Sequence, residues 1–419
     1  MRSSPYSRRI AKSVAQRLDL AIQPEQEVKV RPPRQRIRLL LLRLIPYLTW
    51  PLKLLSHQSH PSPQSILLIR PDHLGDLLFT TPALRLLREA FPQARITCLV
   101  GPWSKAVVEN NPHVDEIALC PFPGFTRQKK RSMLEPYVIL FRQAKRLRQE
   151  SFDLAIILRF DHWWGALLAY LAGIPRRVGY DIAEVRPFLT DVVSYSPHRH
   201  EVEQNLALME RVSGFESRAS GWPLEFHSTT RDEAFAEGYL ARHGVQDGDL
   251  LICIHPGAGA PVKLWRNEGW AQVADALAQR YGAKVILTGS AEESSLCRAI
   301  ADEMTTQPIV AAGETSLGGL AAIMARCQLA LGVDSGPLHL AVAVGTPTVH
   351  LFGPVDSRAF GPWGNPAHHI VITSDMDCIP CNRLDYPAAE LDQHPCVRNI
   401  TVAQVLEAVD KLITGGESL

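Results

Sequence analysis

The chain has 419 residues, of which 46% are hydrophobic and 21% are charged, as is typical of a folded globular protein. This length excludes a single hydrophobic core of average size, so two domains are expected. The formal net charge is +1, but residues 1–64 hold 12 Lys/Arg against 3 Asp/Glu, so a basic extension precedes a mildly acidic body. A charge asymmetry of this kind indicates a membrane or a nucleic acid as a partner.

Residues 34–55 of the basic extension are apolar enough to seek a bilayer. Two prolines and two basic residues interrupt them, whereas a spanning helix needs about 20 clean apolar residues. Basic flanks with a Tyr and a Trp suit a segment that lies in the membrane interface. The alternative is a surface helix docked on the protein's own body. No secretory signal is expected. We therefore expect contact with a membrane surface and no nucleic-acid partner.

Apolar strands alternate with amphipathic helices after residue 65. In the first half, strands are predicted at 66–69, 96–100, 117–120, 154–158 and 177–180, the last as an edge strand, and helices at 74–91, from 104, and at 134–149, 164–172 and 201–212. Residues 214–248 are predicted to form a polar connection. In the second half, strands are predicted at 250–255, 284–288, 309–312, 329–333 and 346–352, and helices at 268–280, 292–303, 316–325, 338–344 and 402–413. This alternation predicts an α/β fold with two parallel, Rossmann-like sheets facing a shared cleft.

Residues 332–354 read GVDSGPLHLAVAVGTPTVHLFGP, which predicts a strand, a polar turn, a helix and a second strand. Asp334, Ser335 and Gly336 form the turn, and Pro337 suits the start of a helix. The N–H groups at such a helix start can hold a phosphate. The alternative is an ordinary β-α-β unit with a well-capped helix.

The first predicted strand leads directly into RPDHLGDLLFTTPA. Gly75 permits close approach of a ligand to the backbone, and Asp76 lies in the first turn of the next helix. A carboxylate there can act as a general base for an alcohol. The alternative is an Asp that only stabilises its own helix dipole. Asp72 competes for either role, and His73 is similarly placed.

A second loop, HPGAGAPVKLWRNEGW, begins at His255 at the end of another predicted strand. Gly257 and Gly259 suit a loop around a diphosphate, and Lys263 can neutralise phosphate charge. The loop is neither a Walker A nor a GxGxxG motif. Glycines after strands also occur for steric reasons alone. Small residues that leave room for a nucleotide end two further strands, namely Thr288, Gly289 and Gly313.

The C-terminal region contains Cys378, Cys381 and Cys396, with His394 nearby. Together they could form a Cys3His zinc site, although free thiols are an equal alternative. We expect no catalytic metal and no cofactor.

Four stretches occur in order along the chain: RPDHLGDLLFTTPALRLLREAFP, HPGAGAPVKLWRNEGWAQVADAL, LTGSAEE and the GVDSGPLHL stretch above. Together they closely resemble the family 9 glycosyltransferases, the ADP-heptose:lipopolysaccharide heptosyltransferases. The resemblance runs from about residue 65 to the C-terminus and leaves out residues 1–64. It implies a GT-B fold, with an acceptor domain at 65–235 and a nucleotide-sugar domain at 236–419. It also implies an inverting, metal-independent transfer.

The resemblance implies a role for individual residues. Asp76 matches the general base, Lys263 a contact to the donor diphosphate, and Asp334, Ser335, Gly336 and His339 the donor loop. With the loop residues described above, the expected donor-binding set is His255, Gly257, Gly259, Lys263, Thr288, Gly289, Gly313, Asp334, Ser335, Gly336 and His339. The expected acceptor contacts are Arg70, His73, Arg127 and Lys130, although the basic loop that holds the last two can equally be a solvated loop.

The expected partners are a nucleotide-sugar donor, foremost an ADP-sugar, and a lipid-linked or phosphorylated glycan acceptor. The resemblance implies transfer of a sugar, foremost heptose from ADP-heptose, onto a lipopolysaccharide core or a related surface glycan, although no residue of the sequence fixes heptose. It also implies a cytoplasmic protein that is peripheral on the inner membrane. The alternatives are another nucleotide-sugar enzyme of the same fold, such as an epimerase, and a non-catalytic module that binds sugar nucleotides.

Overall fold

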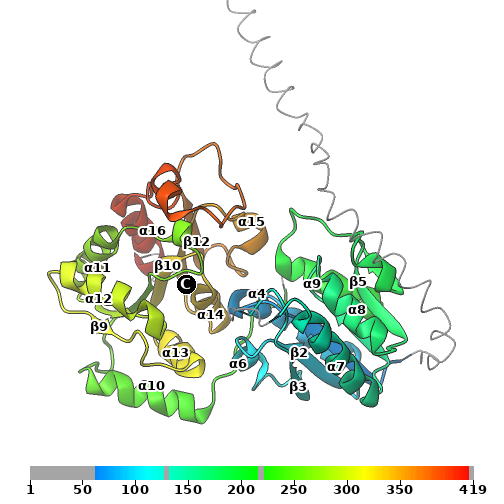
Figure 1. Ribbon diagram of the computed structural model, residues 1–419. Helices are drawn as coiled ribbons and strands as arrows, with labels where there is room; N and C mark the ends of the chain where they lie inside the picture. The colour runs from blue at the N-terminus through cyan, green and yellow to red at the C-terminus, as the bar shows by residue number, and fades with distance from the viewer. Residues whose placement is uncertain (1–61, 127–131, 216–220, 415–419) are drawn as a thin grey trace, which may run out of the picture. The chain divides into compact units, whose positions relative to one another are not determined.

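Two parallel six-stranded sheets form the framework of the computed structural model, which describes residues 62–126, 132–215 and 221–414 (Figure 1). The basic extension, apart from its last three residues, lies outside the described part of the chain, as do Arg127 and Lys130. The strands of the first sheet are β1 (Ser65–Arg70), β2 (Arg95–Val100), β3 (Glu116–Leu119), β4 (Leu154–Ile157), β5 (Arg176–Tyr180) and β6 (Asp191–Val193). The strands of the second sheet are β7 (Leu251–His255), β8 (Lys284–Leu287), β9 (Ile309–Val310), β10 (Leu329–Val333), β11 (Thr348–Phe352) and β12 (His369–Thr373).

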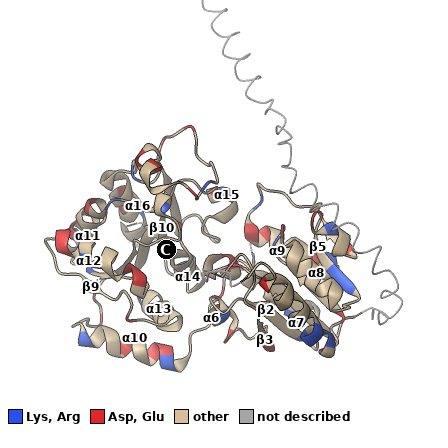
Figure 2. Ribbon diagram, viewed as in Figure 1, with Lys and Arg blue, Asp and Glu red and all other residues tan. Residues whose placement is uncertain are grey.

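Helices connect the strands of both sheets. Those between the strands of the first sheet and directly after it are α4 (Leu74–Leu78), α5 (Thr81–Ala90), α6 (Lys105–Val108), α7 (Glu135–Gln149), α8 (Trp163–Leu171), η1 (Arg186–Phe188) and α9 (Glu201–Ser213). The remaining helices are α10 (Thr230–Arg242), η3 (Pro261–Lys263), α11 (Asn267–Tyr281), η4 (Ala291–Glu293), α12 (Ser294–Glu303), α13 (Leu317–Met324), α14 (Gly336–Ala343), α15 (Ser357–Phe360), η5 (Ala388–Gln393) and α16 (Val402–Thr414). Charged residues gather on helices such as α7 and α10 and are sparse along the strands (Figure 2).

Both sheets have the same strand order. The first runs β3-β2-β1-β4-β5-β6, and the second, read from its other edge, runs β9-β8-β7-β10-β11-β12. In each sheet the first and fourth strands are therefore neighbours, and the direction of winding reverses between them. Ligands of such sheets bind beyond the carboxyl ends of the strands at this switch point. The loops that follow β1, β4, β7 and β10 are thus the places to look for a site.

The central strands have the composition that this position requires. All residues of β1 (SILLIR) and of β7 (LICIH) are buried. Strands covered by helices on both faces read as continuous apolar runs rather than alternating ones. The GT-B-type α/β architecture predicted from the sequence is therefore confirmed.

Three features differ from the predicted elements. The helix expected at 74–91 is two helices, α4 and α5, because the chain breaks at Phe79–Thr80 and Pro82 lies in the first turn of α5. β5 is not an edge strand, since the short strand β6 pairs with it in parallel. The polar connection contains α10, which a capping box of Thr229 and Asp232 begins.

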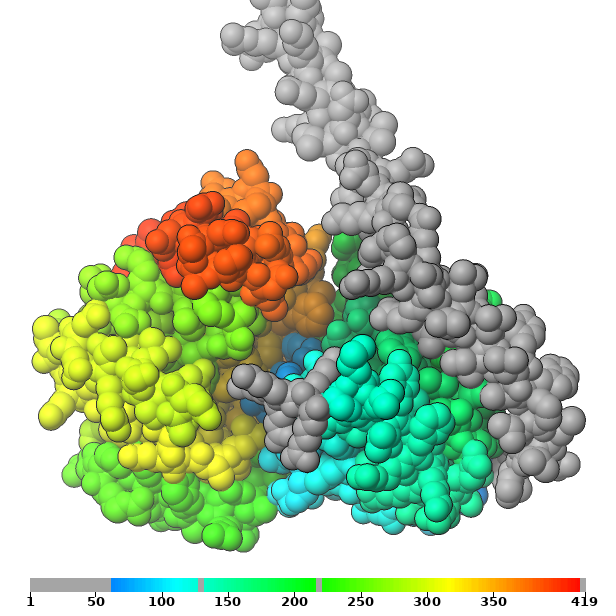
Figure 3. Space-filling view, viewed as in Figure 1, coloured from blue at the N-terminus to red at the C-terminus, as the bar shows by residue number. Residues whose placement is uncertain are grey.

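Helix α10 packs against α13, and their surfaces adjoin in Figure 3, green against yellow. The domain boundary predicted between residues 235 and 236 falls inside α10; the division into 65–235 and 236–419 remains a proposal. No helix in the described ranges is both long and apolar enough to cross a bilayer.

Helices α4 and α14 bring the two switch points together. α4 follows β1, α14 follows β10, and the two helices pack on each other. A Cβ placed on Gly336 would lie 3.0 Å from side-chain atoms of Leu74, and one placed on Gly75 would lie 3.2 Å from Cδ2 of His339. One continuous hydrophobic cluster therefore includes residues of β1 and α4 as well as residues of α14 and β10.

Gly332 in β10 provides a test of this packing. A Cβ at this position would lie 2.5 Å from the His255 carbonyl oxygen and would also meet Leu338. Because a backbone atom cannot move aside cheaply, Gly332→Ala should destabilise the protein by about 1–3 kcal/mol, seen as a lower midpoint of thermal unfolding. Gly259→Ala is the matched control, since nothing lies within 4 Å of its Cβ position. Equal midpoints for the two variants would contradict this packing.

Candidate functional site

Arg70 is the last residue of β1 and lies buried at the switch point of the first sheet. Its Nη2 forms an ion pair of 2.8 Å with Glu201, and its Nε lies 2.8 Å from Asp72. Its Nη1 donates to the carbonyl oxygen of Leu158, 3.0 Å away. Only 3% of the Arg70 side chain is exposed. We expected this guanidinium to contact an acceptor. In the structure it is bound by protein groups, and its positive charge acts on the neighbouring carboxylates.

Asp72 lies between two cations. Its carboxylate pairs with Arg70 on one side and with Arg159, which follows β4, on the other. Burial alone would raise the pKa of Asp72, but the two guanidinium groups outweigh it and hold the pKa below its usual value. With 2% of its side chain exposed, Asp72 is an ionised partner for the arginines and is poorly placed to accept a proton from a ligand.

Asp76 lies in the first turn of α4 and is the more accessible carboxylate. Its side chain is 35% exposed, and its Oδ1 lies 3.9 Å from Nη2 of Arg70. Desolvation by the surrounding protein, followed by the negative charge of Asp72, raises the pKa of Asp76 to about 7, although Arg70 pulls in the other direction. A carboxylate with a pKa near neutrality can both accept and hold a proton at physiological pH.

The charge balance of this cluster adds to the effect of desolvation on the pKa of Asp76. Three carboxylates, of Asp72, Asp76 and Glu201, share two guanidinium groups, and Arg159 also pairs with Asp161 at 2.6 Å. Burial raises the pKa of Glu201 as well. Because like charges in a buried site cannot all be ionised cheaply, the carboxylate with the weakest contact to Arg70 is the one that keeps its proton longest.

The switch point of the second sheet holds a different arrangement. Lys263, at the end of η3, forms an ion pair of 2.7 Å with Asp334, which follows β10. Nε2 of His339, on α14, lies 3.9 Å from the same carboxylate. Burial would raise the pKa of Asp334, but Lys263 and His339 outweigh it and lower the pKa. Asp334 therefore orients the one lysine at this switch point.

Two polar side-chain atoms beside this pair have no partner within the described part of the chain. They are Oγ of Ser335, in a residue 8% exposed, and Nδ1 of His339, in a residue 3% exposed. No side chain caps α14, which begins directly after Ser335. Buried polar groups are normally hydrogen-bonded, so these atoms and the start of α14 are suited to receive a polar ligand.

The other predicted donor residues lie along the same edge of the sheet. Nδ1 of His255 lies 3.2 Å from Oγ1 of Thr288, and both residues are buried. A Cβ on Gly257 would meet the carboxylate of Glu293, the end of a flexible side chain that would have to move aside. Gly259 has open space beside it, and Gly289 and Gly313 adjoin η4 and the start of α12. The close approach of Glu293 to Gly257 is consistent with the alternative considered from the sequence, in which glycines follow strands for steric reasons alone.

The two clusters adjoin through the contact between α4 and α14. Gly75 precedes Asp76 in the chain and lies against His339. His339 in turn lies 3.9 Å from the carboxylate of Asp334. The rings of Phe79 and His339 meet edge to face, with 4.6 Å between their centroids. A carboxylate with a raised pKa therefore lies close to a lysine and an unfilled helix start.

Three residues of the first cluster were missed by the sequence analysis: Arg159, Glu201 and His162. Burial lowers the pKa of His162 to about 4. Arg159 and His162 follow β4, and the strand order would have indicated them had β1 and β4 been known to be neighbours. Glu201 starts α9, far from the other residues along the chain, and no local pattern marks it.

His73 is exposed, and its ring lies 5.5 Å from that of Trp103.

The cysteines of the C-terminal region do not gather into a site. Cys378 and Cys381 are exposed, whereas Cys396 is buried. The described ranges contain no group of three or more His, Cys, Asp or Glu residues able to hold a metal ion.

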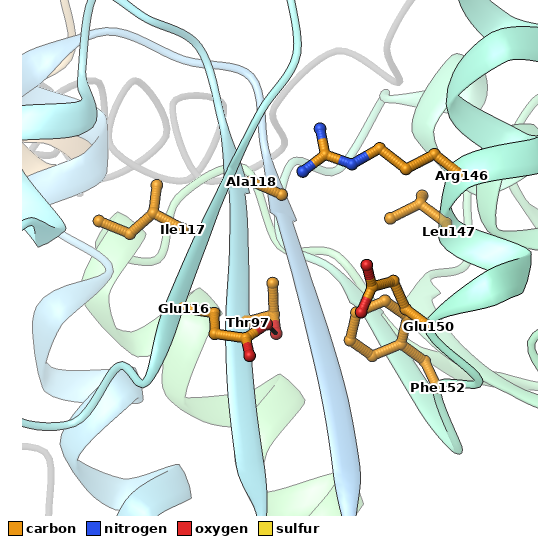
Figure 4. Close-up of a pocket in the computed structure, with 8 residues that line it drawn as sticks. All are labelled: Thr97, Glu116, Ile117, Ala118, Arg146, Leu147, Glu150 and Phe152. Atoms are coloured by element: carbon orange, nitrogen blue, oxygen red, sulfur yellow. Dashed lines mark hydrogen bonds between the residues drawn. The ribbon is translucent and has the colours of Figure 1, made fainter.

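A shallow pocket is present in the first sheet, away from both clusters (Figure 4). It is lined by Thr97, Glu116, Ile117, Ala118, Arg146, Leu147, Glu150 and Phe152. These residues lie toward the amino ends of β2 and β3. Arg95 pairs there with Glu116 and with Glu150. The pocket is at the wrong end of the sheet for a ligand of this fold.

Comparison with known proteins gives a consistent result. The family model of glycosyltransferase family 9 (heptosyltransferase) matches residues 140–388. Lipopolysaccharide heptosyltransferase 3 of Escherichia coli is 29% identical over 82% of this chain and 99% of its own length. A family 9 glycosyl transferase of Veillonella parvula has a solved structure with a TM-score of 0.72 and 28% identity, covering 84% of this chain and 98% of that one. The E. coli ADP-heptose LPS heptosyltransferase II structure, at 23% identity, has a TM-score of 0.67 and covers 84% and 100%.

The raised pKa of Asp76 predicts a specific effect on stability. The folded-state pKa of about 7 lies above the ordinary value of 3.8, so the stability linked to this group is present at low pH and is lost as the pH rises through about 7. Asp76→Asn should therefore raise the midpoint of thermal unfolding above about pH 8, and this gain should shrink as the pH falls toward about 4.

Asp181→Asn is the control for this effect, because Asp181 pairs with Arg186 at the surface. It should give no gain that grows with pH. An Asp76→Asn variant that is equally destabilised at all pH values would contradict a strained carboxylate at this position.

Proposed function

This chain belongs to glycosyltransferase family 9, the heptosyltransferase family, and we propose that it transfers a heptose from ADP-heptose to a lipopolysaccharide core or a related surface glycan. The observation that carries the proposal is the contact of Gly75 with His339. From this contact we infer that the carboxylate of Asp76, on the proposed acceptor side, lies near the Lys263–Asp334 pair, on the proposed donor side. A transferase needs a base and a leaving-group site within reach of one sugar.

The proposed reaction is a direct displacement with inversion. The acceptor hydroxyl oxygen attacks the anomeric carbon while its proton passes to the Asp76 carboxylate. The bond between that carbon and the diphosphate oxygen breaks, and ADP leaves with the bonding electrons. The pKa of about 7 for Asp76 suits this task, because a base works best when its pKa lies near the working pH.

On the donor side, we assign the leaving diphosphate to Lys263 and the start of α14. Lys263 Nζ is held 2.7 Å from Asp334, and the partial positive charge of a helix N-terminus stabilises an anion. Preorganised charge of this kind stabilises the leaving group without reorganisation. A metal ion is not required in this scheme, so a chelator should leave the rate unchanged.

The choice of ADP and heptose rests on the relatives. One similar solved structure is described as an ADP-heptose LPS heptosyltransferase and one relative as a lipopolysaccharide heptosyltransferase. We extend this donor and acceptor class to the present chain. A screen of ADP-, UDP- and GDP-sugars with lipopolysaccharide-core acceptors tests the assignment, with turnover of ADP-heptose as the expected result.

Removal of the proposed base should abolish transfer but spare donor binding. Asp76→Asn keeps the side-chain size and should lower the transfer rate by about 10²–10⁴-fold, the usual contribution of a general base. In the wild type, the rate should rise with pH through about 7, where the base loses its proton. ADP binding measured by calorimetry should be unchanged, because Asp76 lies outside the donor loop.

Two outcomes would count against this scheme. Retained transfer by Asp76→Asn would eliminate Asp76 as the base. Release of a free epimerised sugar, with no glycosylated acceptor, would identify the alternative function, a nucleotide-sugar epimerase.

Lys263 gives an independent prediction. Lys263→Gln should lower kcat/KM for the donor by about 10²–10³-fold, the cost of removing one group that stabilises developing charge. It should also destabilise the fold, since Asp334 is then buried without its cation. Adding Asp334→Asn to this variant should restore stability but not activity. Lys284→Gln is the control, because Lys284 forms a surface pair with Asp249 at 2.8 Å; an equal loss of activity in both would refute the assignment.

A further inference from the structure

Helix α7 carries the main group of exposed large hydrophobic side chains in the described ranges. Leu134, Tyr137, Val138 and Phe141 are 69%, 52%, 52% and 63% exposed, and Met133, just before the helix, is 92% exposed. Their spacing is i, i+3, i+4 and i+7, so they form one stripe on one face of the helix. The buried face of α7 is a separate one, made of Leu140, Ala144 and Leu147. Clustered exposed apolar groups of this kind mark an interaction surface.

The same exposed stripe continues into basic residues. Lys145 and Arg148 lie four and seven positions beyond Phe141, hence on its face, and Arg142 and Arg146 lie beside it. Blue segments, which mark Lys and Arg, lie along α7 in Figure 2. After Glu135, the helix contains no acidic residue. The surface is therefore apolar at one end and positively charged at the other.

We propose that this face of α7 docks on an anionic phospholipid surface. A helix with an apolar stripe and adjacent Lys and Arg side chains is suited to the membrane interface, where the apolar groups enter the acyl boundary and the cations meet the headgroups. The chain's own basic extension is a poor occupant, because its 12 Lys/Arg against 3 Asp/Glu would be repelled by the basic end of α7.

The position of α7 relates this surface to the Asp76 cluster. β3 ends at the carboxyl edge of the first sheet, and α7 starts from that edge and runs back toward the start of β4. Nε1 of Trp164, just after β4, donates to the carbonyl oxygen of Pro136 in the first turn of α7, 3.3 Å away. The apolar end of α7 is thus on the edge that holds the Asp76 cluster. Resting on the proposed function, this arrangement would put the base near the bilayer in which a lipid-linked acceptor is anchored.

Contacts continue from the apolar end of α7 to the cluster. The ring of Trp164 lies 6.2 Å from that of His162, and His162 contacts Phe122 and Phe125 at 5.3 and 5.8 Å. The guanidinium of Arg159, which pairs with Asp72, lies 5.1 Å from the Phe125 ring. An ordered layer of aromatic groups therefore links the docking face to the proposed acceptor side.

A probe attached at the docking face of the full chain tests the proposal directly. Cys378 and Cys381 are the exposed cysteines, so Cys378→Ser/Cys381→Ser gives a background in which Phe141→Cys can be spin-labelled. With vesicles of phosphatidylethanolamine and phosphatidylglycerol, the label at position 141 should become accessible to oxygen and protected from a water-soluble relaxation agent. A label at Phe215→Cys, originally 56% exposed, should stay in water. A label at 141 that remains in water on bound protein overturns the proposal.

Affinity gives the second measurement. Leu134→Ser/Phe141→Ser should weaken binding to these vesicles at least about tenfold, and Arg142→Gln/Lys145→Gln about fivefold for each charge removed. Phe215→Ser should change nothing, and neutral phosphatidylcholine vesicles should bind the wild type weakly.

Two results point to another occupant and contradict the proposal. A label at 141 that is already immobile without vesicles indicates the chain's own extension. A dimer lost on Phe141→Ser indicates a second copy. These readouts do not depend on turnover, so they stand apart from failure of the proposed reaction.

Discussion

The buried guanidinium of Arg70 dominates the electrostatics of the charged cluster beyond β1. It ends the central strand β1 and lies against the carboxylates of Asp72, Asp76 and Glu201. Together with Arg159 it supplies two positive charges to three negative ones. Asp72 and Glu201 approach Arg70 to 2.8 Å, whereas Asp76 remains at 3.9 Å. Desolvation of Asp76, followed by the negative charge of Asp72, therefore raises its pKa, because Arg70 opposes the shift only from a distance.

Topology puts this cluster where it can act. Both sheets have the same strand order, so each has one point at which the winding reverses and the loops beyond the strands are left open to a ligand. One reversal point supplies a carboxylate with a raised pKa, and the other supplies a lysine held by Asp334 and the free start of α14. Close packing of α4 on α14 depends on Gly75 and Gly336, since a larger side chain would push these helices apart. In the proposed function, the fold thus joins a proton acceptor to an anion site.

Much of this arrangement follows from the sequence, and the remainder depends on long-range contacts. The strands β1, β7 and β10 are apolar runs that bury both faces, so they could be predicted along with the loops after them. Asp76 in α4, Lys263 in η3 and Asp334 after β10 lie directly beyond those strands and were singled out from their motifs, and their roles stay proposals. The charge cluster was not predicted, because Glu201 comes from a distant helix and Arg159 from another strand. Gly257 was interpreted as a phosphate contact, which stays a prediction, and the structure adds that the Glu293 side chain lies against it. The break between α4 and α5 and the short strand β6 escaped prediction because their local patterns are weak.

The central claim is that Asp76 keeps its proton until near neutral pH. The most direct measurement is the carboxyl carbon chemical shift of Asp76 followed through a pH titration by NMR, with its signal assigned by its absence from Asp76→Asn. A midpoint near the value of about 7 is predicted. A midpoint near the ordinary value of 3.8 would contradict the account, because Asp76 would then be an unperturbed surface carboxylate.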